Sequence, residues 1–127
     1  MIKMKILHTD KAPAAVGPYC QAVQVGDMIF TSGQLAIDPA NGNLINDDIE
    51  KATRRSLDNV KAILEEAGSS LEKVVKTTIF LDDMDNFARV NEVYGEYFSD
   101  HKPARSCIQV ARLPKDAIVE IEVIALA

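Results

Sequence analysis

The spacing of apolar positions along the chain separates helix-like segments from strand-like ones. In two segments, 49–67 and 85–99, apolar or small residues recur about every 3.6 positions, which predicts helices. Segments rich in β-branched residues or with period-two alternation predict strands. These strands are 2–8, 20–25, 28–33, 74–81, 105–110 and 118–125. The order β-β-β-α-β-α-β-β indicates an α+β domain.

Turn-forming and capping residues set the boundaries between these elements. Gly26-Asp27 separates two strands, and glycine at the first central position favours a type II′ hairpin turn. Segment 34–47 is dense in Asp, Asn, Gly and Pro and is predicted to be a loop. Asn46 or Asp47 is expected to cap the first helix, and Gly68 is expected to end it in the left-handed conformation.

The two strand–helix–strand connections are expected to be right-handed, which places both helices on one face of the sheet. Alternation assigns the core-facing and opposite sides of each strand. On the helix-covered face we expect Val75, Thr77, Ile79, Leu81, Ile108, Val110 and alternate residues of 119–125. The opposite face is expected to carry Lys76, Thr78, Arg105, Cys107, Gln109, Glu120 and Glu122 together with Phe80 and Ile124. An uncovered face of this mixed polarity is either solvated or buried against another copy of the chain. We favour self-association, because Phe30, Phe80 and Ile124 would otherwise be exposed.

Length and charge narrow the class of protein. The 127 residues, of which 47% are hydrophobic, suit one domain spanning 1–127. The net charge of −5 argues against a nucleic-acid partner, which needs a basic surface. No apolar stretch has the length of a membrane span and no secretory signal is visible, so a cytoplasmic protein with no membrane partner is expected. Cys20, Cys107, His8 and His101 lack metal-ligand spacing, and no cofactor motif occurs, so neither metal nor cofactor is expected.

Arg105 and Cys107 are two positions apart on one predicted strand and therefore project from the same face. A guanidinium matches a carboxylate through two parallel hydrogen bonds, although an isolated arginine on a strand is more often a surface ion-pair partner. Cys107 is either a small buried hydrophobic residue or a reactive thiol. The sequence shows no activating histidine beside it, so the nucleophilic role is the weaker interpretation.

Glu120 and Glu122 alternate with apolar residues, a pattern typical of a solvated sheet face. If that face is covered instead, burial raises the carboxyl pKa toward values useful for acid–base catalysis. Three further sites have two open interpretations. Tyr19 either lines a pocket or packs, Ser32-Gly33 either admits a ligand or ends a strand, and Asn91 either lies on the helix surface or caps a cavity.

Several motifs together resemble the signature of the RidA (YjgF/YER057c/UK114) family. They are 14–19 (AAVGPY), 31–34 (TSGQ), 38–42 (DPANG), 86–94 (NFARVNEVY), 103–107 (PARSC), 113–115 (LPK) and 119–122 (VEIE). The match extends over nearly the whole chain. One departure is Cys20, which stands where the family typically has serine.

The resemblance implies a chorismate-mutase-like α+β fold, a six-stranded mixed sheet with two helices packed on one face, and a homotrimer with clefts between subunits. It also implies a metal- and cofactor-independent 2-iminobutanoate/2-iminopropanoate deaminase. Such enzymes hydrolyse imines, formed from the enamines that pyridoxal-phosphate-dependent dehydratases release, to 2-oxo acids and ammonia. Arg105 would hold the substrate carboxylate, Glu120 would activate water, and Cys107 would lie near the imine. Tyr19, Ser32, Gly33 and Asn91 would complete the substrate-binding site. The family order also places strand 74–81 between the last two strands.

Two other functions remain open at this point. The family has also been assigned endoribonuclease and translation-inhibitor activity, which the negative charge disfavours. Arg54-Arg55 with Lys51 forms a small basic cluster that is interpreted as the solvated face of the first helix. A non-catalytic module that binds 2-oxo acids through Arg105 is the other alternative.

Overall fold

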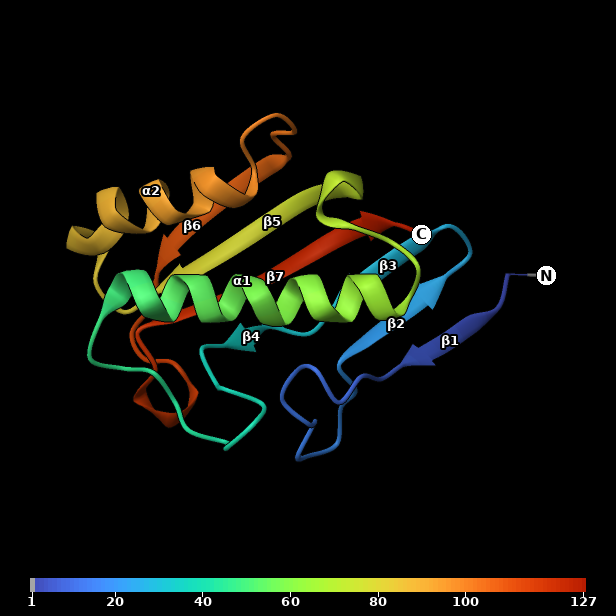
Figure 1. The fold of residues 1–127 in the computed structure, drawn as a ribbon, viewed down its shortest axis with the longest axis horizontal. Helices are drawn as coiled ribbons and strands as arrows, with labels where there is room; N and C mark the ends of the chain where they lie inside the picture. Colours follow the sequence, from blue (N-terminus) through green and yellow to red (C-terminus); the bar gives the residue numbers. More distant parts are fainter. Residues whose placement is uncertain (1) are drawn as a thin grey trace.

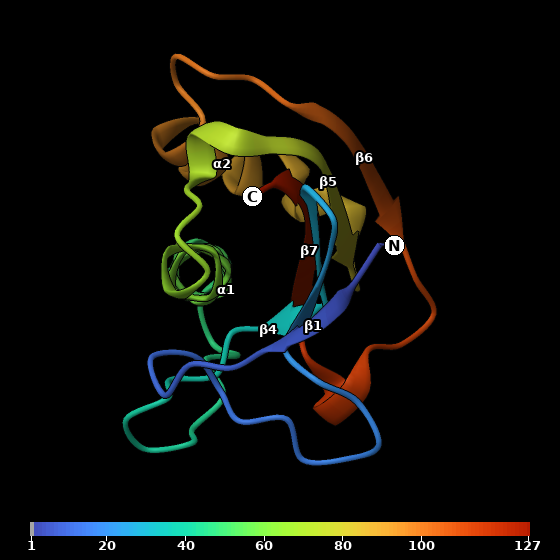
Figure 2. The ribbon, with the colours of Figure 1, turned by 90° about the vertical axis from the view of Figure 1, so that its right-hand side faces the viewer.

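The computed structural model describes residues 2–127, in which two helices cover one face of a curved sheet (Figures 1 and 2). The strands are β1 (Met4–Leu7), β2 (Ala22–Val25), β3 (Met28–Thr31), β4 (Gln34–Leu35), β5 (Val74–Leu81), β6 (Ala104–Gln109) and β7 (Val119–Leu126). The helices are α1 (Ile49–Glu66) and α2 (Phe87–Tyr97), with 3-10 turns at Leu71–Lys73, Met84–Asn86 and Pro114–Asp116. The predicted α+β class and the placement of both helices on one face are confirmed.

The strands form a mixed sheet in the order β1-β2-β3-β7-β5-β6. β5 pairs in parallel with β6 and antiparallel with β7, while every other pair of named strands is antiparallel. β5 therefore lies between the last two strands, as the family resemblance implies. This arrangement makes β6 one edge of the sheet, beside α2 (Figure 1).

The sequence missed one strand, because β4 has only two residues and lies in a segment rich in turn formers. β4 pairs with β7, with Leu35 opposite Glu120. It adds a seventh strand to the six that the sequence predicts.

The β2–β3 hairpin agrees with its prediction. Gly26 has φ +57°, and among residues 2–127 the only non-glycine residues with positive φ are Lys115 and Asp116. Asp27 thus lacks the positive φ that a type I′ turn would require, as expected for type II′.

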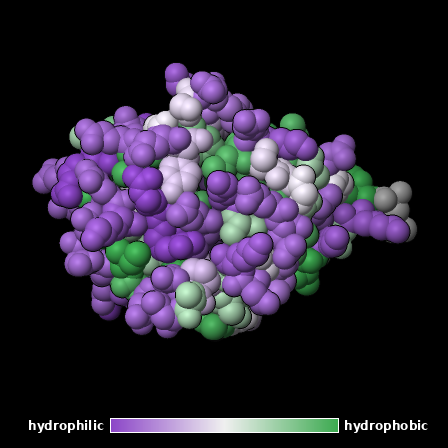
Figure 3. Space-filling model, in the orientation of Figure 1, coloured by the Kyte–Doolittle hydropathy of each residue, from purple (hydrophilic) through white to green (hydrophobic). Residues whose placement is uncertain are grey.

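α1 buries one apolar stripe against the sheet and turns a polar face outward, which Figure 3 shows as a largely hydrophilic surface. Its cap differs from the prediction. Asp48, not Asn46 or Asp47, accepts hydrogen bonds from the backbone N–H groups of Glu50 and Lys51. Gly68 does follow the helix at φ +81°, where a side chain would be strained.

The face assignment of β6 was wrong. The register pairs Arg105 with Thr77 and Cys107 with Ile79 in parallel strands, so both side chains share the helix-covered face. Ile108, expected in the core, is 45% exposed on the opposite face, and Gln109 also changes sides. The error arose because alternation gives which residues of a strand share a face but not which face it is.

Val75 is also misplaced, because a bulge between Val74 and Lys76 interrupts the β5–β7 register. Val74 takes the buried position and Val75 is 44% exposed. The rest of β5 and β7 follows the prediction. Thr77, Ile79 and Leu81 are fully buried, as are Val119 and Ile121.

The uncovered face of the sheet carries an apolar row that crosses four strands. The register aligns Ile6 with Val23, Val23 with Phe30, and Phe30 with Ile124. Ile6 is 67% exposed and Phe30 is 40% exposed. Exposed apolar surface of this kind marks interaction sites, so the prediction of self-association keeps its physical basis.

Candidate functional site

The seven residues singled out in the sequence form two clusters on opposite faces of the sheet. Arg105, Cys107 and Asn91 lie on the helix-covered side, at β6 and α2. Tyr19, Ser32, Gly33 and Glu120 line one cavity elsewhere on the same protomer. We call these the arginine cluster and the cavity cluster. On β5, Phe80 pairs with Glu120 and the adjacent Ile79 pairs with Cys107. Because adjacent residues of a strand point to opposite faces, Glu120 and Cys107 lie on opposite faces of the sheet.

In the arginine cluster, contacts from α2 hold the Arg105 guanidinium. Its Cζ lies 4.8 Å from the ring centre of Tyr94 and 5.4 Å from that of Phe87. Nη1 donates a hydrogen bond of 2.6 Å to Oδ1 of Asn91. Among residues 2–127, no carboxylate lies within salt-bridge distance of Arg105. The group is therefore ordered, and it keeps its other donors for an anion.

Tyr94 is itself anchored to the sheet. Its hydroxyl is 2.8 Å from Oγ1 of Thr77, and both residues are buried. Burial raises the pKa of Tyr94, while the hydrogen bond with Thr77 and the charge of Arg105 lower it. Tyr94 therefore stays a neutral phenol near neutral pH. Tyr94 is not recognisable as a site residue from the sequence, because a tyrosine on the apolar side of a helix is typical of core packing.

Cys107 lies next to Arg105 on the strand and packs against the core. Burial raises the pKa of its thiol, and the charge of Arg105 opposes that effect without reversing it. The thiol is thus mainly protonated at neutral pH, which disfavours a nucleophilic role. It is a weak hydrogen-bond donor beside the guanidinium.

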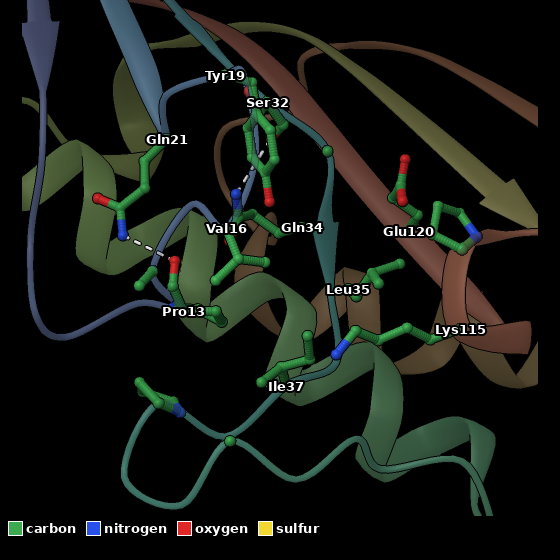
Figure 4. A pocket seen from close by; sticks show the side chains of 15 residues that line it. Pro13, Val16, Tyr19, Gln21, Ser32, Gln34, Leu35, Ile37, Lys115 and Glu120 are labelled. Atoms are coloured by element: carbon green, nitrogen blue, oxygen red, sulfur yellow. Dashed lines mark hydrogen bonds between the residues drawn. The ribbon is translucent and has the colours of Figure 1, made fainter.

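The cavity cluster borders a space of about 640 Å³ between the N-terminal loop, β4 and the loop before β7 (Figure 4). Tyr19 is 55% exposed at this cavity. The Ser32 hydroxyl donates a hydrogen bond of 2.6 Å to the Cys20 carbonyl, so its role within the protomer is to fix this loop. The lining also includes Gln21 and Lys115, which the sequence analysis did not single out as site residues.

Glu120 is the acidic group of this cavity. Half-burial raises the pKa of its carboxyl, and the negative charge of Glu122 raises it further. The carboxyl group lies directly over Gly33. A Cβ at residue 33 would overlap a carboxylate oxygen and come within 2.7 Å of the carboxyl carbon. No positive φ occurs at this residue, so the constraint is one of space: a side chain here would displace the Glu120 carboxyl group from its present position.

Buried polar side chains of α1 hold β4 and thereby the backbone next to Gly33. The Ser56 hydroxyl donates a hydrogen bond of 2.7 Å to the Gln34 carbonyl. The Asn59 amide donates to the carbonyls of Leu35 and Ile37, at 3.1 and 2.9 Å. These bonds tie β4 and the residues that follow it to α1, next to Gly33 and Glu120.

The loop before β7 forms a second wall of the cavity and has an unusual backbone. Lys115 and Asp116 have φ of +60° and +55°, a region that residues with a side chain rarely adopt. Asn46 holds this loop through two bonds: its amide donates to the Asp116 carbonyl at 2.9 Å, and its Oδ1 accepts from the Ile118 N–H at 3.1 Å. Arg112 also pairs with the Asp116 carboxylate at 2.6 Å.

Comparison with known proteins identifies the family. The family model described as endoribonuclease L-PSP matches residues 9–127. The chain belongs to the RidA family. The 2-iminobutanoate/2-iminopropanoate deaminase of Salmonella typhimurium is 50% identical over 125 residues, which cover 96% of this chain and 97% of that protein.

Solved structures of RidA family proteins share the fold. A putative endoribonuclease from Thermotoga maritima superposes with a TM-score of 0.95 at 56% identity, covering 97% of both chains. Escherichia coli TdcF with bound serine gives a TM-score of 0.93 at 48% identity, covering 97% of this chain and 98% of that one. The chorismate-mutase-like fold that the sequence resemblance implies is thus confirmed.

Within residues 2–127, no group of three or more His, Cys, Asp and Glu side chains is placed to hold a metal ion. Of the helices in that range, none combines the length and apolar character needed to cross a bilayer.

Proposed function

We propose that the protein is a 2-iminobutanoate/2-iminopropanoate deaminase that works without metal or cofactor. In this proposal it assembles as a homotrimer, and each active site combines the arginine cluster of one protomer with the cavity cluster of the next. The relative named as this deaminase, at 50% identity over almost the whole chain, supports the activity. The serine-bound relative supports recognition of a small amino or 2-oxo acid.

The observation that carries the proposal is the ordered Arg105 guanidinium with donors to spare at a sheet edge. A planar fork of donors binds a carboxylate through two hydrogen bonds and orients it. Glu120, on the opposite face, cannot meet that substrate within the same protomer. The exposed apolar row with Ile6 and Phe30 provides the surface on which a second copy would pack and close the site.

The reaction requires only proton transfer and positioning. Arg105 holds the substrate carboxylate while Glu120, as the carboxylate, accepts a proton from water. The water oxygen bonds to the imine carbon, and the proton passes through Glu120 to the imine nitrogen, which gives a carbinolamine. The hydroxyl proton then follows the same route, the C–N bond breaks, and the 2-oxo acid and ammonia leave.

The raised pKa of Glu120 suits both halves of this cycle, because the group must accept a proton and return it. Cys107, protonated and beside Arg105, would line the substrate site as a weak donor. Asn91 would hold Arg105, while Tyr19, Ser32 and Gly33 would shape the opposite wall.

The direct test generates the imine in place with a threonine dehydratase and follows 2-oxobutanoate and ammonia. The protein should accelerate their release, whereas an unchanged rate would overturn the proposal. Binding of 2-oxobutanoate without acceleration would indicate the non-catalytic module. Filter binding of RNA at low salt addresses the endoribonuclease alternative, for which the net charge of −5 predicts no retention.

A further inference from the structure

Two residues on two different elements, Thr77 and Tyr94, are linked to each other beside the Arg105 side chain. Thr77 on β5 is the direct strand partner of Arg105 on β6. Tyr94 on α2 reaches down to the Thr77 hydroxyl and lays its ring beside the guanidinium. The hydroxyl contact is buried, so it holds the ring in one place relative to the strand from which Arg105 projects.

We propose that Tyr94, anchored by Thr77, is a positioning residue that fixes the plane of the Arg105 guanidinium for carboxylate binding. The inference rests on the proposed function for its substrate, but it concerns the carboxylate-binding step alone. In this inference Tyr94 and Thr77 act through Arg105, which Tyr94 contacts directly and Thr77 reaches through Tyr94.

The geometry explains why two kinds of contact are needed. The hydrogen bond to Asn91 holds one edge of the guanidinium but leaves the group free to rotate about that bond. The ring face of Tyr94, at 4.8 Å, is attracted to the cation and restricts that rotation. With one edge and one face held, the remaining donors point in a fixed direction, which two parallel hydrogen bonds to a carboxylate require.

Ordinary core packing is the competing explanation, because Tyr94 is buried and also packs on Phe98 at a ring separation of 4.7 Å. Packing alone predicts that variants of Tyr94 alter stability and leave ligand affinity unchanged in folded protein. A positioning role predicts an effect on carboxylate affinity that depends on the presence of Arg105. The two explanations therefore differ in measurable terms.

The experiment measures the Kd of 2-oxobutanoate by calorimetry, with thermal unfolding to identify folded variants. Tyr94→Leu, which removes the ring, should weaken binding about tenfold, the range expected for a partly desolvated cation–π contact. Thr77→Val and Tyr94→Phe keep the ring but release its anchor, so each should weaken binding by a smaller factor. The KM of the imine should rise in parallel, with less change in kcat.

A control and a double-variant cycle make the result specific. Tyr97 lies on the same helix with Arg54 over its ring at 5.9 Å, so Tyr97→Leu removes a similar pair and should leave the Kd unchanged. In an Arg105→Ala background, Tyr94→Leu should have no further effect on affinity. Equal effects of Tyr94→Leu with and without Arg105 would overturn the inference.

The design separates failure of this inference from failure of the proposed function. If the protein binds 2-oxobutanoate with the expected dependence on Tyr94 but hydrolyses no imine, the positioning role stands and the deaminase proposal fails. If the protein hydrolyses imines and the Thr77 and Tyr94 variants bind 2-oxobutanoate normally, the deaminase proposal stands and the positioning role fails. Should Tyr94→Leu fail to fold, Thr77→Val and Tyr94→Phe decide the question, because each breaks the Thr77–Tyr94 hydrogen bond and keeps the ring. Wild-type affinity in both would overturn the inference.

Discussion

Arg105 and Glu120 project from opposite faces of one sheet, separated by strand β5. Arg105 pairs across β5–β6 with Thr77 on the helix-covered side, and Glu120 pairs across β5–β7 with Phe80 on the uncovered side. A four-carbon substrate cannot reach both groups through a packed sheet. The proposed catalysis therefore depends on a neighbouring copy, and this dependence gives the first prediction.

Two inactive variants should restore activity when they assemble together. Arg105→Ala lacks one half of the site and Glu120→Gln lacks the other, so a mixed trimer contains some intact sites. Random assortment of equal amounts should give about one quarter of wild-type activity. The measurement is imine hydrolysis after the variants are co-expressed or exchanged. No recovery, despite mass-spectrometric evidence of mixed assemblies, would show that each site lies within one protomer.

Replacing the guanidinium should remove carboxylate recognition. Arg105→Ala should lower kcat/KM about 100-fold, since charge-assisted hydrogen bonds to the substrate are lost. Arg105→Lys should recover only part of this loss, because an ammonium lacks the planar fork. Arg54→Ala is the matched control, since Arg54 also stacks on a tyrosine and pairs with Glu96. Normal kinetics in Arg105→Ala would contradict the proposed site.

The raised pKa of Glu120 predicts opposite effects of Glu120→Gln on activity and on stability. Burial favours the protonated form of Glu120 in the folded state. The contribution of Glu120 to the free energy of unfolding is therefore fully present below its pKa in the unfolded chain. It is lost as the pH rises through its pKa in the folded protein. At neutral pH the glutamine variant should therefore melt at a higher temperature than wild type while losing activity. The difference in melting temperature should shrink as the pH is lowered.

The pH–rate profile tests the same group kinetically. The acid limb of kcat/KM should lie above the ordinary glutamate pKa of 4.5, because Glu120 must be ionised to accept a proton. Glu122→Gln removes the neighbouring negative charge and should move that limb to lower pH. An acid limb that stays in place in Glu122→Gln would argue against Glu120 as the titrating base.

Gly33→Ala should displace the Glu120 carboxyl group, since the added Cβ overlaps it. We expect kcat to fall about 10- to 100-fold with a smaller change in KM, because misplacing a catalytic group by about 1 Å costs that much. Gly95→Ala is the control, because a Cβ there meets nothing within 4 Å. A crystal structure of the Gly33 variant with Glu120 unmoved and activity lost would point to a different role for Gly33.

The sequence predicted the elements well because their signals are local. The six longer strands and both helices show their own periodicity, and the glycines at 26 and 68 lie at positive φ. The sides of β6 were misassigned because it is a half-exposed edge strand, with no continuous buried stripe to orient it. Its orientation is decided by the parallel register with β5, a non-local property. β4 was missed because it has only two residues. Their carbonyl groups accept hydrogen bonds from the side chains of Ser56 and Asn59, on a helix that is distant in sequence.

The candidate site shows the same division. Motif resemblance named Arg105, Glu120 and their companions and implied clefts between subunits, but it did not place the two residues on opposite faces of the sheet. Tyr94 and Thr77 carry no motif of their own, and only their contact in three dimensions distinguishes them from core residues. Their roles could not be assigned before the packing of α2 on β5 was known.

Asn46 holds one wall of the cavity in place although it is far from that wall in the sequence. It was one of two expected caps of α1, together with Asp47. Instead it binds a turn 70 residues further along the chain, where the consecutive residues Lys115 and Asp116 adopt a left-handed backbone. Without this contact, that turn would relax toward ordinary conformations and carry Pro114 and Lys115 away from Glu120. The shape of the cavity beside Glu120 thus depends partly on an amide in a connecting loop.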